Sequence, residues 1–110
     1  MNLRALIDYL IKVDLKTKVV MGFENPHSYR GYYEDLAFEP VRNTTVRKML
    51  KAAKSALGTT YGGYKGGEYK MKEYTDVWLA WEGSCGEGIG YILLDYMTGN
   101  LLKKRITGVL

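Results

Sequence analysis

The chain has 110 residues, a length typical of one compact domain. Hydrophobic residues make up 46% of it and charged residues 25%, an ordinary globular composition that excludes a disordered tail or a fibrous repeat. The net charge is +4, and the longest strongly apolar run, residues 89–97, is much shorter than the ~20 residues of a membrane helix. One cysteine, Cys85, excludes a disulfide within these residues and is typical of a reducing cytoplasm.

The first part of the chain predicts a helix followed by strands. Residues 3–13 place apolar side chains at helical spacing on one stripe, which indicates an amphipathic helix. Residues 19–23 are a short β-branched run and predict a strand. Asn25 and Pro26 predict a turn, and residues 36–38 predict a second strand before Pro40.

A second helix is predicted between residues 46 and 57. Asn43, Thr44 and Thr45 precede it as N-cap candidates, and Gly58 follows it where a left-handed C-terminal residue belongs. Its apolar stripe consists of Val46, Met49, Leu50, Ala53 and Leu57, and its opposite face carries Arg47, Lys48, Lys51 and Lys54.

The second half of the chain is rich in glycine turns. Residues 59–72 contain two Gly-Gly pairs and predict a hairpin or loop, and residues 76–82 predict a largely buried strand. Residues 83–88 predict a tight loop, while residues 89–97 fit either a short helix or a strand. The tail, residues 100–110, is expected to pack on a partner, with fraying of the chain end as the alternative.

These elements together predict a small α+β domain. Its two main helices are expected to pack on an antiparallel or mixed sheet, and residues 1–110 are expected to form a single domain. Residues 1–15 and 100–110 are the expected contacts between copies in an oligomer.

Charge is strongly segregated along the chain. Residues 42–72 hold eight basic residues against Glu68 alone, whereas residues 73–95 hold five acidic residues and no basic one. The basic segment would attract phosphate, nucleic acid or an acidic protein. Alternatively, the acidic segment folds beside it and neutralises it, or the charges only solvate a helix face.

The residues offer little for catalysis. His27 is the single histidine, which excludes a histidine pair and an HExxH zinc site, and no phosphate-binding or dinucleotide fingerprint occurs. A nucleophile–base pair of Cys85 and His27 is a formal alternative, and paired carboxylates such as Glu34/Asp35 or Glu82/Glu87 are spaced like surface acids. We therefore expect a protein that is not an enzyme and has no metal or other cofactor.

A binding surface is the stronger expectation, because His27, Tyr29, Arg30 and Tyr32 occur within six residues. Arginine forms two hydrogen bonds to a phosphate or lies flat on a base, and tyrosine offers a stacking face. The alternative is structural: Tyr29 and its neighbour Tyr33 are half-buried anchors, and Arg30 pairs with Glu34 or Asp35.

Two further groups of residues could add to such a surface. In the Gly-Gly segment, backbone N–H groups could turn toward one anion, with Lys65 adding charge at the loop tip. Trp78 and Trp81 would point to opposite faces of a strand, so that one of them could stack on a base. A tryptophan in the core is the plainer alternative for either.

Several of these segments resemble a known family. The runs GFENPHSYRGYYEDLAFEP, NTTVRKMLKAAKSALG, YKGGEY and TDVWLAWEGSCGE, which span about residues 22–97, are similar to the first-described type of Thoeris anti-defence sponge proteins of bacteriophages. The PHSYRG…LAFEP block is the distinctive part of the resemblance.

The resemblance implies a phage protein without enzymatic activity. Such proteins sequester a cyclic ADP-ribose isomer, some also hold cyclic oligonucleotides, and this blocks activation of the Thoeris effector in the cytoplasm of the infected bacterial host. Members are homo-oligomers, from dimer to hexamer, with pockets between subunits. The resemblance makes Arg30 a phosphate ligand, Trp78 or Trp81 the base stacker and Arg105 a second phosphate contact. Asn43 and Asn100 remain alternatives for reading the base edge.

Two other kinds of partner stay open. The basic segment could bind DNA or RNA with salt-dependent affinity, although no stable nucleic-acid complex and no membrane contact is expected. The protein could instead cover a host enzyme, with its tyrosines as the main contacts.

Overall fold

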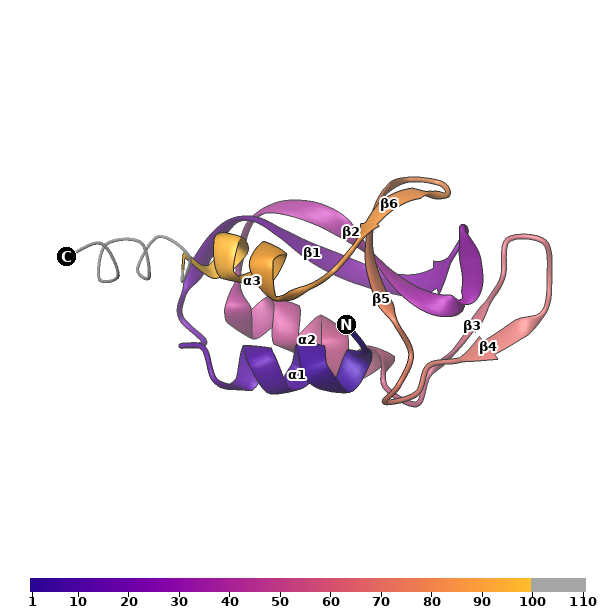
Figure 1. The fold of residues 1–110 in the computed structure, drawn as a ribbon, viewed down its shortest axis with the longest axis horizontal. Coiled ribbons are helices and arrows are strands. Elements are labelled where there is room, and N and C mark those ends of the chain that lie inside the picture. The colour runs from indigo at the N-terminus through magenta and orange to yellow at the C-terminus, as the bar shows by residue number, and fades with distance from the viewer. Residues whose placement is uncertain (100–110) are drawn as a thin grey trace.

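The structure, a computed structural model, describes residues 1–99 and folds them into a small α+β domain, as predicted (Figure 1). The helices of this part are α1 (Leu3–Ile11), α2 (Val46–Ala56) and α3 (Tyr91–Thr98). Its strands are β1 (Lys18–Tyr29), β2 (Tyr32–Thr45), β3 (Thr60–Gly62), β4 (Glu68–Lys70), β5 (Val77–Glu82) and β6 (Cys85–Gly88). The expected tail contact, residues 100–110, lies outside the described residues.

The main sheet is mixed and has the strand order β1-β2-β5-β6. The β1–β2 and β5–β6 pairs are antiparallel hairpins, whereas β5 runs parallel to β2 and joins it through Leu36–Phe38 and Val77–Leu79. Strands β3 and β4 form a separate two-stranded sheet between α2 and β5 in the chain. The parallel pair therefore brings the two hairpins into one sheet.

The core lies between the sheet and the helices α1 and α2. Helix α2 packs on β1 and on α1, while α3 lies against β1 (Figure 1). Phe23 and Phe38 are fully buried with ring centres 4.5 Å apart, and Leu6 and Met49 are fully buried beside them in the same cluster. Each such apolar side chain contributes about 1.5–3 kcal/mol on burial.

Helix α2 begins and ends where the sequence predicts. Thr45 has extended backbone, and its side-chain oxygen accepts a hydrogen bond from the Lys48 amide at 3.3 Å. Gly58 has a φ of 81°, and its amide donates to the carbonyl of Met71 at 2.8 Å. Local capping signals therefore define this helix correctly.

Two predicted turns are placed differently. Asn25 and Pro26 do not end β1 but form a bulge inside it, where Asn25 has a φ of 49° and its side-chain amide donates to Glu39. The predicted loop 83–88 contains a turn of only Gly83 and Ser84, because residues from Cys85 onward pair with β5 as β6. Residues 89–97 were predicted to form either a short helix or a strand. In the structure this part of the chain forms a third helix, α3.

None of the helices in the described part is long and apolar enough to cross a membrane.

Candidate functional site

Three hairpin turns meet at one end of the molecule (Figure 1). In the turn between β1 and β2, the guanidinium carbon of Arg30 lies 3.7 Å from the centre of the Tyr64 ring in the β3–β4 loop. Next to it, the hydroxyl of Tyr29 donates to the carbonyl of Ser84 in the β5–β6 turn at 2.7 Å. We call the surface formed by Arg30, Tyr64 and the Gly83–Ser84 turn the hairpin-end site.

Arg30 is available to an anion. Its side chain is exposed, and the two ion pairs formed among residues 1–99 both belong to another arginine, Arg4. The expected alternative, a pair with Glu34 or Asp35, is not formed; Arg30 instead lies on the Tyr64 ring. A cation–π contact at an exposed position contributes about 0.5–1 kcal/mol, little enough for a phosphate to compete with it.

Tyr29 is the buried residue that packs behind the hairpin-end site. It is only 5% exposed and stacks on Trp78 with ring centres 4.8 Å apart. The indole N–H of Trp78 donates to Oδ2 of Asp35 at 2.9 Å. These contacts hold the β1–β2 turn against β5. Tyr29 and Trp78 therefore occupy the structural role that the sequence left open beside the binding role.

Two glycines allow the turns to approach this closely. A Cβ on Gly86 would lie 2.7 Å from the carbonyl oxygen of Leu79 and 3.3 Å from the hydroxyl of Tyr29. A Cβ on Gly31 would lie 2.7 Å from the Tyr29 ring. Both positions lack room for a side chain, so the β1–β2 and β5–β6 turns can only pack on Tyr29 with glycine there.

The β3–β4 loop offers less to an anion than expected. The Gly66 amide donates to the Gly63 carbonyl at 3.0 Å, and the Gly63 amide donates to the Gly67 carbonyl at 3.1 Å. Two of the N–H groups expected to face a ligand therefore close the loop on itself. The loop presents the ring of Tyr64 and the exposed ammonium of Lys65 instead.

The remaining expected site residues lie around the hairpin-end site rather than in it. His27 sits in the β1 bulge with Nδ1 2.9 Å from the Asn25 carbonyl. Tyr32 donates to Glu34, which raises the pKa of Tyr32, and Trp81 is 53% exposed on β5. No hydrogen bond or ring contact in the described part joins Tyr32, Trp81 or Lys65 to Arg30. Arg105 lies outside the described residues.

His27 and Cys85 are on opposite edges of the main sheet. His27 lies on β1 and Cys85 on β6, with β2 and β5 between them. Strands in a sheet are about 4.8 Å apart, so three spacings separate the backbones of β1 and β6 by about 14 Å. A nucleophile–base pair requires contact within hydrogen-bond distance, which this placement does not provide.

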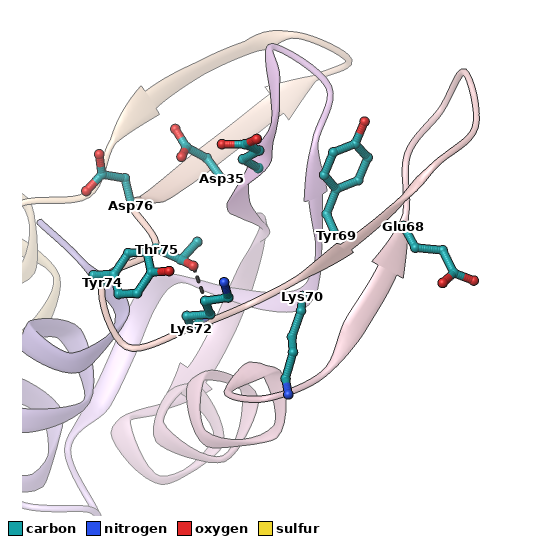
Figure 2. A pocket seen from close by; sticks show the side chains of 9 residues that line it. Asp35, Glu68, Tyr69, Lys70, Lys72, Tyr74, Thr75 and Asp76 are labelled. Atoms are coloured by element: carbon teal, nitrogen blue, oxygen red, sulfur yellow. Dashed lines mark hydrogen bonds between the residues drawn. The ribbon is translucent and has the colours of Figure 1, made fainter.

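A pocket of about 340 Å³ beside β4 was not expected from the sequence. Figure 2 shows the carboxylates of Asp35 and Asp76 on one side of it and Lys72 and Tyr74 on the other. The parallel β2–β5 pairing brings the two carboxylates together, because the Leu36 amide donates to the Asp76 carbonyl at 2.9 Å. Its lining consists of Glu34, Asp35, Glu68, Tyr69, Lys70, Lys72, Tyr74, Thr75 and Asp76.

Burial raises the pKa of Asp35. The charges of Asp76 and Glu34 raise it further, while the hydrogen bond from Trp78 acts in the opposite direction. Among residues 1–99, no group of three or more His, Cys, Asp or Glu side chains could hold a metal ion. The pocket is thus a polar recess with aromatic walls, and sequence spacing gave no signal for it.

Comparison with family models, with curated proteins and with solved structures finds no match for this chain.

Proposed function

We propose that this protein binds a cyclic nucleotide of the cyclic ADP-ribose isomer class and sequesters it unchanged in the cytoplasm of an infected bacterium. Held in this way, the signal cannot activate a Thoeris effector. The proposal draws on the sequence resemblance and on one structural observation. That observation is the guanidinium of Arg30, which forms no ion pair among residues 1–99 and lies on the exposed ring of Tyr64, where three turns meet.

The chemistry of the ligand matches this pair of side chains. A nucleotide diphosphate combines a doubly charged group with a planar ring. The N–H groups of Arg30 can donate to phosphate oxygens, and the ring of Tyr64 can stack on the base. Lys65 on the same loop adds a positive charge.

Sequestration further requires tight binding, because the protein is consumed as it binds. A dissociation constant of 1 nM corresponds to about −12.3 kcal/mol, more than one exposed cation and one ring supply. We therefore include a homo-oligomer, of two to six copies, in the proposal: a neighbouring copy would form the second wall of the hairpin-end site.

The experiment is isothermal titration calorimetry with a cyclic ADP-ribose isomer, followed by heating of the complex and mass analysis of the released ligand. The proposal expects binding and recovery of the unchanged ligand. Arg30→Ala should weaken binding tenfold to hundredfold, since hydrogen bonds to charged groups contribute about 1.5–3 kcal/mol. Arg42→Ala, which removes an exposed arginine from β2, should bind like the unaltered protein. Recovery of a cleaved ligand, or equal loss in both variants, would contradict the proposal.

A further inference from the structure

The outward face of α2 carries only positive charge. Arg47, Lys48, Lys51 and Lys54 are exposed on it, and the helix contains no acidic residue. Since a helix rises ~1.5 Å per residue, these charges extend over about 10 Å of its length. None of these four residues belongs to the hairpin-end site, so this surface has no part in the proposed nucleotide binding.

This charge is not compensated inside the described part of the chain. The acidic segment 73–95 could have neutralised it, but the ion pairs among residues 1–99 are those of Arg4 with Asp8 and with Glu73. Cations three or four residues apart on a helix repel each other, and cations in the first turn oppose the helix dipole. Repulsion among these cations is not offset by an ion pair among residues 1–99, which is typical of a surface kept for a partner.

A shallow groove of about 480 Å³ lies within this face. Its lining includes two apolar side chains, Leu15 from the loop after α1 and Leu50 from α2, which we call its apolar floor. Three cations, Arg47, Lys51 and Lys54, line it together with Ser55. We define these residues as the α2 groove.

We propose that the α2 groove docks an acidic polypeptide segment of another protein. One large apolar side chain of that segment covers Leu15 and Leu50, and flanking carboxylates pair with Arg47, Lys51 and Lys54. The complementary charges speed the association of the two proteins and fix the position of the segment along the groove. The apolar contact excludes water from the ion pairs around it.

The groove fits this partner better than a nucleic acid or a membrane. A phosphate backbone would use the cations but would leave the apolar floor uncovered. A membrane-surface helix needs large apolar side chains that project into the lipid, and the exposed large hydrophobic residues of the described part lie on other elements. An acidic segment with one apolar side chain would contact both the cations of the groove and its apolar floor.

The test is fluorescence anisotropy with a labelled short peptide that has glutamates on both sides of a central leucine. Lys51→Glu combined with Lys54→Glu should weaken binding about tenfold or more, because each reversal turns attraction into repulsion. Arg42→Glu combined with Lys70→Glu changes the net charge equally but outside the groove, and should bind nearly as well as the unaltered protein. Circular dichroism shows whether each variant is folded; if the first pair is not, Lys51→Gln with Lys54→Gln replaces it.

Further measurements separate the alternatives. The peptide with serine in place of leucine should bind more weakly, and equal binding would overturn the role of the apolar floor. A peptide with lysines in place of glutamates should bind the Lys51→Glu, Lys54→Glu protein better than the unaltered protein. A short DNA duplex that binds this face more tightly than the peptide would overturn the proposal, as would self-association lost only in the groove variant. Nucleotide binding by the same variants should be unchanged, so the proposed function is tested separately.

Discussion

Arg30 packs over the face of Tyr64, with 3.7 Å between its guanidinium carbon and the centre of the ring. The contact joins the β1–β2 turn to the β3–β4 loop through two exposed side chains, since Tyr64 is 69% exposed. An exposed ring and an exposed cation are thereby positioned together before any ligand arrives.

Replacement of Tyr64 tests this positioning. Tyr64→Ala removes the ring and should weaken nucleotide binding, whereas Tyr64→Phe keeps the ring and should retain most of the affinity. The free energy of unfolding should change by less than about 1 kcal/mol in either variant, the scale of an exposed cation–π contact. Calorimetric titration and thermal unfolding measure the two effects; a loss of affinity in Tyr64→Phe equal to that in Tyr64→Ala would show that the hydroxyl, not the ring, matters.

Gly86→Ala should destabilise the fold. The added methyl group would lie 2.7 Å from the carbonyl oxygen of Leu79, in the backbone of the neighbouring strand. We expect a loss of about 1–3 kcal/mol in the free energy of unfolding, the usual cost of overpacking. Gly88→Ala on the same strand is the control, because nothing lies within 4 Å of a Cβ there. Urea denaturation compares them, and equal stability of the two variants would contradict the close approach.

Tyr29→Phe should cost more stability than Tyr32→Phe. Tyr29 is buried and its hydroxyl donates to the Ser84 carbonyl, whereas Tyr32 is exposed and donates to Glu34. Loss of the first hydrogen bond should lower the free energy of unfolding by about 0.5–1.5 kcal/mol. Loss of the second should fall within experimental error. Chemical denaturation measures the stability of the two variants. A larger loss in Tyr32→Phe than in Tyr29→Phe would contradict the hydrogen bond between Tyr29 and the β5–β6 turn.

Asp35 should make stability depend on pH in a defined direction. Its pKa is raised in the folded state, so the folded protein favours the protonated form. The resulting stabilisation is fully present below the pKa of the unfolded chain and is lost as pH rises through the higher folded value, starting from about pH 4. Asp35→Asn carries no such charge, and its amide oxygen can still accept from Trp78.

The stability of Asp35→Asn relative to the unaltered protein should therefore increase as pH rises from 3 toward neutrality. Denaturation curves at a series of pH values measure the difference. Parallel pH profiles for the two proteins would mean that burial of Asp35 does not affect its ionisation.

Local signals in the sequence were sufficient to predict two of the three helices in the described part of the chain. In α2, the apolar spacing, the Thr45 cap and the left-handed Gly58 all act within a few residues of one another, and the predicted helix was confirmed. The apolar stripe of residues 3–13 also predicted α1, although this helix ends at Ile11, two residues earlier than expected. Residues 89–97 could not be assigned by the same means, because an apolar run of this length packs equally well as a strand or a short helix.

In the strands, pairing within the sheet had more influence on the structure than the local sequence signals. Asn25 and Pro26 predict a turn, yet pairing with β2 on both sides of them leaves only a bulge. Trp78 faces Tyr29 and Asp35 because β5 lies beside β2, a neighbour that the spacing of the tryptophans does not indicate.

The sequence by itself determined the α+β class, the ends of α2, and the presence of an arginine among aromatic residues in a glycine-rich chain. Each of these depends on residues close together in the chain. Only the tertiary structure decided that Arg30 meets Tyr64, that Asp35 and Asp76 line one pocket, and that Leu15 lies beside the cations of α2. Such contacts depend on which strands pair over long distances in the chain, and that pairing is chosen by the packing of the whole core.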